Sequence, residues 1–138
     1  MTETLVDTNV MLDVAGDDPI WGEWSERALA RAVDDGGLVM NQIVYAELAG
    51  GYLRREQLDE ALKAWPFQRE DVPWDAAFMA GLAFVNYRRR GGARTSTLPD
   101  FFIGAHAAAR GYRLLTRDRG HYASYFPTLD IVSPERQP

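Results

Sequence analysis

Four acidic residues, Asp7, Glu47, Asp100 and Asp118, stand where an alternating chain would bring them to one edge of a sheet. Each either closes an apolar run or falls in the opening turns of a helix. Desolvating an isolated carboxylate costs several kcal/mol unless a cation or a hydrogen-bond donor compensates for it. A hard divalent cation with oxygen ligands is the simplest shared partner. The four acids together therefore predict metal-dependent chemistry.

Each acid also has an ordinary structural explanation. Asp7 suits the N-cap of the helix that follows it, and Asp118 suits a turn. Asp100 lies three residues after Thr97, which is the spacing of a capping box, and a carboxylate there favours the helix dipole. For any one acid taken alone, these interpretations remain open.

Glu47 is the hardest of the four to explain structurally. Together with Glu47, three apolar or small residues have the i, i+3, i+4, i+7 spacing of the core-facing side of a helix: Val44, Leu48 and Gly51. A glutamate on such a stripe is rarely buried without a partner. Asp100 likewise shares a helical face with Ile103, Gly104 and Ala107.

Hydrophobic periodicity predicts strands alternating with helices. Strands are expected near residues 4–6, 38–40, 67–72, 113–116 and 129–132, and helices near 8–13, 19–34, 44–51, 57–65, 74–90 and 99–111. This alternation predicts one α/β domain, residues 1–138, with a parallel sheet of about four to five strands covered on both faces. Gly36 and Gly37 are expected to end the second helix. In the helix at 74–90, the residues expected to face the core are Ala77, Gly81, Phe84 and Val85.

Composition and charge narrow the function classes. The chain has no cysteine, which excludes disulfides and thiolate metal sites and suits the cytoplasm. The acidic first twenty residues predict no signal peptide, and no apolar stretch approaches the ~20 residues that span a membrane. Net charge is −5, yet residues 88–119 hold eight arginines against two acids. This basic excess indicates a polyanion partner, or alternatively a solvated helix end. The candidates for phosphate contact are Arg88, Arg89, Arg90, Arg94 and Arg117.

Other residues with catalytic potential fit less well. His106 lies in an alanine-rich helix and is expected to be packed or solvated. His121 lies in a loop and has no partner at zinc-site spacing. No serine has the context of a nucleophile elbow, and the glycine pairs form no phosphate loop.

Four ordered segments, residues 6–13, 44–48, 98–107 and 115–118, resemble the blocks of PIN-domain ribonucleases and, more narrowly, of VapC toxins from bacterial toxin–antitoxin pairs. The resemblance implies a three-layer α/β/α fold in which the four acids form a catalytic tetrad that binds Mg²⁺ or Mn²⁺. Supporting polar roles fall to Thr8, Asn9 and Thr116. It also implies cleavage of single-stranded RNA, homodimerisation and a VapB-type antitoxin. Some relatives carry a further acid after the fourth, where this chain has Gly120 and His121.

Three alternatives compete with this interpretation. A response-regulator receiver would need a lysine near the acids, and the only lysine, Lys63, lies within a polar helix. A dehalogenase-type phosphatase would need an aspartate where Asn9 stands. The third alternative is a metal-free or inactive PIN-like module that acts by binding protein or RNA.

Overall fold

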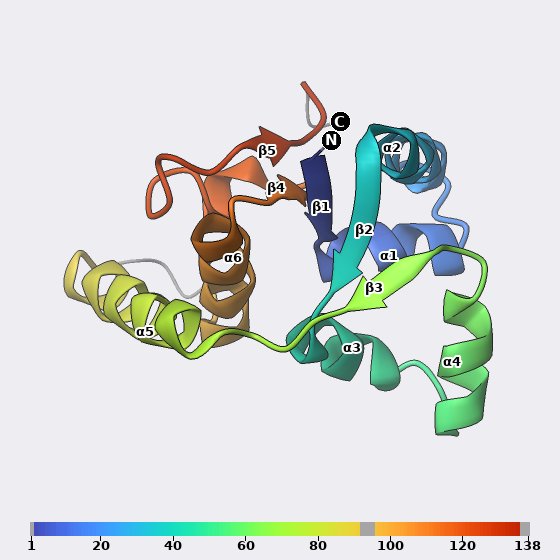
Figure 1. Ribbon diagram of the computed structural model, residues 1–138, viewed down its shortest axis with the longest axis horizontal. Helices are drawn as coiled ribbons and strands as arrows, with labels where there is room; N and C mark the ends of the chain where they lie inside the picture. Colours follow the sequence, from blue (N-terminus) through green and yellow to red (C-terminus); the bar gives the residue numbers. More distant parts are fainter. Residues whose placement is uncertain (1, 92–95, 136–138) are drawn as a thin grey trace.

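Five short parallel strands form a single sheet in the computed structural model, which describes residues 2–91 and 96–135 (Figure 1). The sheet order is β3-β2-β1-β4-β5. The strands are β1 (Thr2–Val6), β2 (Gly36–Met40), β3 (Phe67–Arg69), β4 (Arg113–Leu115) and β5 (Ile131–Val132). The helices are α1 (Thr8–Ala15), α2 (Gly22–Asp35), α3 (Gln42–Ala49), α4 (Arg55–Leu62), α5 (Trp74–Arg89) and α6 (Leu98–Arg110), with a short 3-10 turn η1 (Arg119–His121). The predicted parallel α/β sheet is confirmed.

Helices lie on both sides of the sheet, as predicted. On one side α1 packs on α2, and α2 contacts β1 and β2. On the other side α6 contacts β1 and β4, and α5 packs against α6 away from the sheet (Figure 1). The result is the three-layer α/β/α arrangement. Within the described residues, no helix is long and apolar enough to cross a membrane.

The strand order reverses at β1, which has β2 on one side and β4 on the other. Val6 pairs with Leu115 at the carboxyl ends of β1 and β4, and the Asp7 amide donates to the Leu115 carbonyl at 2.9 Å. Ligands of open α/β sheets bind outside the carboxyl ends of the strands at such a reversal. The fold therefore brings the residues after β1 and β4 to the expected position for a site.

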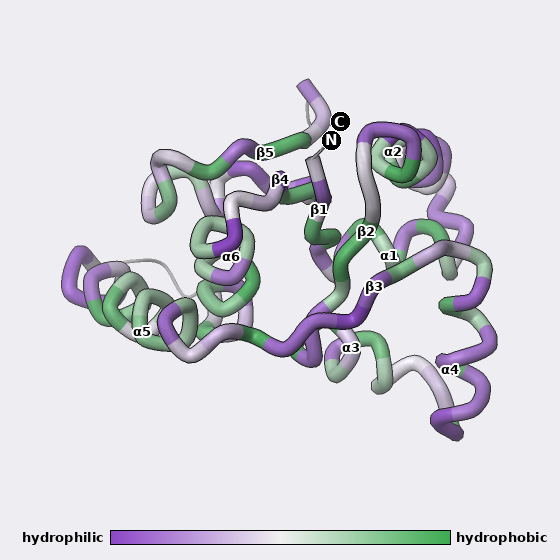
Figure 2. Tube along the Cα trace, in the orientation of Figure 1, coloured by the Kyte–Doolittle hydropathy of each residue, from purple (hydrophilic) through white to green (hydrophobic). Residues whose placement is uncertain are grey.

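The core is densest at this same edge. In β1 and β2 the first two residues are half-buried and the last three are buried. Figure 2 shows both strands becoming greener, and so more hydrophobic, toward their carboxyl ends. Leu5 and Val6 are fully buried, as are Leu114 and Leu115 of β4. Because burial of these apolar residues stabilises the strand ends, the polar residues that follow the strands are held in fixed positions.

Several predicted boundaries differ from the structure. Gly36 does end α2, because its amide donates to the Ala32 carbonyl, but it also begins β2. A Cβ at Gly36 would lie 2.1 Å from the Thr2 carbonyl oxygen, so the strand pairing there requires glycine. The helix predicted to reach Gly51 ends at Ala49, and the one predicted over residues 57–65 is α4. The third strand stops at Arg69, and the Glu70 amide beyond it still donates to the Met40 carbonyl at 2.9 Å. The Glu70 carboxylate contacts His106 of α6 and Tyr112 of the turn that follows α6.

The predicted core face of α5 is wrong by about one residue. The buried positions are Ala76, Ala80, Ala83 and Tyr87. Ala77, Gly81 and Phe84 are half-buried, and Val85 is exposed. The physical reason is that α5 packs on α6 and not on the sheet, so small residues allow the two helices to approach closely. Several large apolar residues are left on the outer face.

Gly104 makes room on α6 for two aromatic rings. A Cβ at this position would lie 2.5 Å from the Phe126 ring and 3.0 Å from the Tyr122 ring. Both rings are buried. The glycine thus lets the segment after η1 pack directly on α6, which fixes Tyr122 in place.

We predict that Gly104→Ala lowers the free energy of unfolding by about 1–3 kcal/mol, because the added methyl overpacks two rings. Urea denaturation measures this change. Gly81→Ala is the matched control, since nothing lies within 4 Å of the added methyl. The control is expected to stabilise the protein by about 0.5–1 kcal/mol through helix propensity. Equal effects of the two substitutions would contradict the packing role of Gly104.

Candidate active site

Asp7 is the most enclosed of the four acids, with 5% of the residue exposed. It caps α1 by accepting the Thr8 amide at 2.7 Å, and it accepts the Thr116 hydroxyl and the Tyr122 phenol, each at 2.8 Å. Burial raises the pKa of Asp7, and the negative charge of Asp100 raises it further, against the opposing effect of these three hydrogen bonds. Capping alone explains one of these contacts but not the two long-range donors.

Tyr122 is a site residue that sequence reasoning missed. Burial raises its pKa well above the ordinary value, and so do the negative charges of Asp7, Asp100 and Glu47. The phenol therefore lies within electrostatic range of three of the four acids. Its contact with Asp7 joins residues 115 positions apart, and the chain gives no local pattern that announces it.

Glu47 faces the open side of the site. The expected burial of its helical stripe is correct for Val44 and Leu48 but wrong for Glu47 and Gly51, which are both exposed. Its carboxylate accepts the Thr8 hydroxyl at 2.7 Å. Because α3 starts directly beyond the carboxyl end of β2, one side of this short helix is open to solvent, and Glu47 lies there.

Asp100 combines a capping role with a place in the site. The Thr97 amide donates to Asp100 Oδ2 at 2.8 Å, so the predicted capping box is present. The side chain is 20% exposed. This contact fixes the carboxylate at the amino end of α6, where the helix dipole favours negative charge.

Thr116 connects the strand ends. Its buried hydroxyl donates to Asp7 and accepts the Asp118 amide at 3.0 Å and the Asn9 side-chain amide at 3.4 Å. The Asn9 carbonyl oxygen in turn accepts the Arg117 amide at 3.2 Å. The residues expected to support the acids therefore do contact one another across β1 and β4.

His121 lies between two of the acids. Its Nε2 is 3.0 Å from Asp118 Oδ2, and its Nδ1 is 3.9 Å from Asp100 Oδ2. His121 was not predicted as a site residue, because it has no histidine or cysteine partner at zinc-site spacing. The usable signal was its position, since it occupies the stretch where some relatives carry a further acid.

The donor set suits a hard divalent cation. Carboxylates from four separate segments, with threonine hydroxyls beside them, are the ligands that Mg²⁺ and Mn²⁺ prefer. Within residues 2–91 and 96–135, no three acidic or histidine side chains are already gathered in a coordinating arrangement. Asp7, Asp100 and Glu47 are each engaged by a neighbouring donor. The residues fit the ion by chemistry and place, and binding requires side-chain rotation.

The arginines predicted to contact phosphate divide into two groups. Arg88 and Arg90 are exposed and lie near the rings of Phe84 and Tyr125, and Arg89 is exposed beside them. Arg117 instead contacts α1 and the segment before α2. Its Nε is 2.6 Å from Asp13 Oδ2, and its guanidinium lies over the Trp21 ring. Arg94 lies outside the described residues.

His106 is packed, in agreement with one of the two expectations for it. It is fully buried, with Nδ1 3.0 Å from the Asn41 amide and Nε2 2.9 Å from Glu70. Glu70 also accepts the Tyr112 phenol at 2.7 Å. Burial and this carboxylate raise the pKa of Tyr112 to about 12. The cluster joins the β3–α5 connection to α6.

Comparison with known proteins agrees with this geometry. The PIN domain matches residues 4–126, which include all four acids and the supporting residues. The chain belongs to the PIN domain family. This membership sets aside the receiver and phosphatase alternatives. No curated protein matches the chain.

Solved structures with this PIN fold cover nearly the whole chain. VapBC2 from Rickettsia felis, bound to a promoter DNA fragment, has a TM-score of 0.74 at 19% identity and covers 95% of this chain and 98% of its own. VapBC-1 from nontypeable Haemophilus influenzae has a TM-score of 0.72 at 20% identity, with 95% and 97% covered. FitAcB from Neisseria gonorrhoeae has a TM-score of 0.68 at 18% identity, with 97% and 99% covered. At these identities the likeness establishes the fold.

Proposed function

We propose that this PIN-domain protein is a divalent-metal-dependent endoribonuclease and the toxin of a VapBC-type toxin–antitoxin pair. The observation that carries the proposal is the linkage of Asp7, Glu47, Asp100 and Asp118 at one sheet edge through Thr8, Thr116, Tyr122 and His121. Structures of similar fold are toxin–antitoxin complexes, which supports the same biological setting.

The four acids would hold Mg²⁺ or Mn²⁺. When bound, such an ion lowers the pKa of a coordinated water and neutralises charge that develops on a phosphodiester. The chain's own contribution is orientation. Thr116 and Tyr122 hold the Asp7 carboxylate in one direction, and Thr8 holds Glu47. Asp100 is held by the start of its own helix.

A metal-free binding module remains the second candidate, because Asp7 and Asp100 both make ordinary capping contacts. Product analysis separates the two functions. A nuclease is expected to convert single-stranded RNA to shorter fragments with added Mn²⁺, and to leave DNA of the same sequence intact. Binding without any fragment would favour the module.

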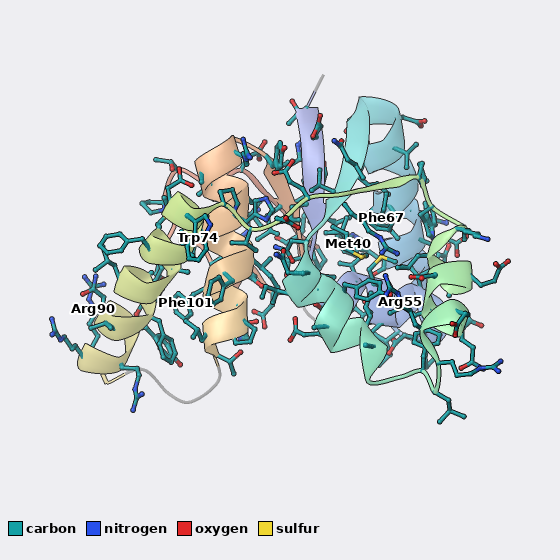
Figure 3. All side chains as sticks on the ribbon, turned by 60° about the horizontal axis from the view of Figure 1, so that its bottom comes forward. Met40, Arg55, Phe67, Trp74, Arg90 and Phe101 are labelled. Atoms are coloured by element: carbon teal, nitrogen blue, oxygen red, sulfur yellow. The ribbon has the colours of Figure 1, made fainter. Side chains whose placement is uncertain are left out.

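We propose that Arg88 and Arg90, which are exposed at the carboxyl end of α5, contact RNA phosphates. Figure 3 shows Arg90 at the far end of α5 from Trp74. Arg90 lies over Tyr125, three residues after Tyr122 of the site. A cationic surface beside the acids would offset their repulsion of a polyanion.

We predict that replacing both Arg88 and Arg90 with alanine weakens binding to every single-stranded RNA sequence. Each lost phosphate contact is expected to reduce the slope of log affinity against log salt by about 0.7. The measurement uses an Asp100→Asn background to prevent cleavage. Arg54→Ala, an exposed arginine on the distant side next to α4, is the control. Unchanged RNA affinity would contradict the contact, and weakened antitoxin binding alone would assign the arginines to that partner.

We propose that the outer face of α5 forms the interface with a second copy of the chain. Four large apolar residues are exposed there, at helical spacing: Trp74, Phe78, Leu82 and Val85. Figure 2 shows α5 green along its middle and purple at both ends. The first turn of α5 carries Asp75, Asp71 precedes the helix, and the last turn carries Arg89. Two α5 helices packed antiparallel about a two-fold axis would pair these opposite charges and cover the stripe.

We predict that Phe78→Glu or Leu82→Glu converts the dimer to a monomer, because each places a charge in the centre of an apolar contact. Sedimentation equilibrium measures the mass. Leu53→Glu is the matched control, since Leu53 is the most exposed large apolar residue described, lies outside this face and should leave the dimer intact. A wild-type protein that is monomeric at high micromolar concentration would contradict the interface.

A VapB-type antitoxin is the second proposed partner. The similar structures from Rickettsia felis and Haemophilus influenzae are VapBC assemblies. An antitoxin segment with acidic side chains would compete with RNA for the arginines of α5. The measurement compares RNA cleavage by the protein alone with cleavage by the protein co-purified with the antitoxin, and the complex is expected to have lost the activity.

A further inference from the structure

We infer that the pocket between α2 and the neighbouring face of β4 and β5 is a binding site for a nucleoside monophosphate group. The pocket has a volume of about 530 Å³. Small-molecule sites in proteins have volumes of about 300–1,000 Å³. None of the four acids of the active site lines this pocket. The inference therefore goes beyond the proposed function and depends on no metal ion.

The register of the sheet builds the floor of the pocket. Thr4 of β1 pairs with Arg113 of β4, and Leu115 of β4 pairs with Val132 of β5. Register partners point to the same face of a sheet, as do residues two apart on one strand, so these four side chains share a face. The opposite wall is one face of α2, with residues at helical spacing: Trp24, Arg27, Ala28, Arg31 and Ala32.

Three arginines surround the apolar floor. Arg27 and Arg31 lie one helical turn apart on α2, and Arg113 lies on β4. Arginine keeps its charge and binds phosphate through paired N–H groups. Arg31 is exposed, and none of the ion pairs among the described residues includes it. Arg27 pairs with Glu23 of the same helix, but both side chains are more than three-quarters exposed, and such a pair is weak.

The acids near the pocket leave the two α2 arginines available. Asp35 Oδ2 lies 3.0 Å from Arg113 Nη1, and Asp130 Oδ2 lies 3.4 Å from Arg113 Nε. These two carboxylates hold the Arg113 guanidinium beside the floor. Glu135 is exposed at the rim. An anion is therefore expected to contact Arg27 and Arg31.

The rest of the lining fits a nucleoside better than a bare inorganic anion. Trp24 is half-buried and presents aromatic surface, on which a base of any sequence can stack. The Thr4 hydroxyl at the floor has no hydrogen-bond partner within the described residues. Buried hydroxyls are usually bonded, so the protein itself leaves this polar group incomplete. Inorganic phosphate would use the arginines alone, whereas a nucleoside monophosphate would also occupy the apolar part.

The pocket adjoins the edge of the sheet that carries the acids. Leu115 lines the pocket, and the next residue, Thr116, donates its hydroxyl to Asp7. The Thr116 amide donates to the Val132 carbonyl at 3.0 Å. A nucleotide in the pocket would therefore lie on the α2 side of the same strands. Two sources offer this chemistry, a free mononucleotide and the phosphorylated end of a nucleic-acid strand.

Nuclear magnetic resonance titration of the full-length ¹⁵N-labelled protein tests the inference. EDTA is present, so that no metal ion at the acids contributes to binding. Adenosine monophosphate is the probe, and adenosine and inorganic phosphate each supply one half of it. The monophosphate is expected to bind about tenfold or more tightly than either half, because only it uses both parts of the pocket. The amide signals expected to shift include those of Trp24, Ala28, Arg31 and Val132.

Two kinds of variant test the location independently. Arg27→Ala combined with Arg31→Ala removes both available cations and should weaken binding about tenfold or more. Ala28→Phe fills the pocket without changing any charge and should also block binding. Arg54→Ala, an exposed arginine outside the pocket, is the control for loss of charge and should bind normally. Circular dichroism verifies that each variant is folded.

The possible outcomes are distinct. Binding that survives both in the double arginine variant and in Ala28→Phe overturns the inference, as do signal shifts confined to the residues around the four acids. Equal affinity for inorganic phosphate and for the monophosphate also overturns it. No binding at millimolar concentration overturns it and leaves the nuclease standing, because the acids take no part. With a 5′-phosphorylated RNA trinucleotide as second probe, retained affinity assigns the site to a strand end, and lost affinity assigns it to a free mononucleotide.

Discussion

Replacing Asp7 or Asp100 with asparagine is expected to lower RNA cleavage by about 10²–10³-fold or more, because each change removes charge that holds the cation and stabilises the transition state. The fold should survive. Asparagine has nearly the same shape, and the Thr116 and Tyr122 hydroxyls beside Asp7 can rotate to accept its amide. The measurement is single-turnover cleavage of single-stranded RNA. Asp34→Asn, on the exposed end of α2, is the control and should leave cleavage unchanged.

The stability of the Asp7→Asn protein provides a second readout. Because burial raises the pKa of Asp7, the folded protein binds a proton there more tightly than the unfolded chain does. The free energy of unfolding of the metal-free wild type should therefore fall as pH rises from the ordinary carboxyl range, about 4, through the raised pKa. Asp7→Asn lacks this loss and should gain stability relative to wild type at neutral pH. Unfolding of the variant would mean that the acid is structural.

Arg117→Ala is expected to lower the free energy of unfolding by about 1–3 kcal/mol, the typical cost of leaving a buried acceptor without its donor. The Asp13 carboxylate of this pair is buried, whereas the Arg117 side chain is 27% exposed. Asp13 is 3% exposed and accepts the Ser25 hydroxyl at 2.7 Å in addition to Arg117. Without the arginine, one hydroxyl remains to compensate a buried carboxylate. The stacking of the guanidinium over Trp21 is also lost.

Urea denaturation of Arg117→Ala, Asp13→Asn and the double variant measures the coupling between the two residues. A coupling of about 1 kcal/mol or more is expected, and Arg31→Ala, at an exposed position within α2, is the surface control. A loss below about 0.5 kcal/mol, typical of an exposed position, together with weakened RNA binding would contradict the structural role and restore the phosphate-contact prediction. The expected outcome separates Arg117 from Arg88 and Arg90, with which the sequence prediction grouped it.

The fold was predictable because its signals are local. Alternation of apolar strands and amphipathic helices specifies a parallel sheet, and Asp7 directly follows a strand, so its place at the sheet edge follows from the pattern. Thr116 is predictable in the same way. The prediction failed for the exposure of Glu47, because periodicity gives the face of a helix but not where that helix overhangs the sheet.

Contacts that depend on the path of a loop could not be predicted from the hydrophobic periodicity of the sequence. Tyr122 and His121 reach the acids because the chain after β4 makes one short turn and packs on α6 at Gly104. Nothing in the spacing of these residues specifies that turn. The prediction of the core face of α5 failed for a related reason. A helix that packs on another helix buries its small residues, so Phe78 is exposed to solvent.

The most direct test of the metal-dependent nuclease is cleavage of single-stranded RNA by protein stripped of divalent ions. With EDTA present, the protein is expected to remain folded and to leave the RNA intact. Re-addition of Mg²⁺ or Mn²⁺ should restore cleavage in the wild type but not in Asp100→Asn. Cleavage that persists in EDTA, or a folded protein that cleaves no RNA with either ion, would contradict the assignment.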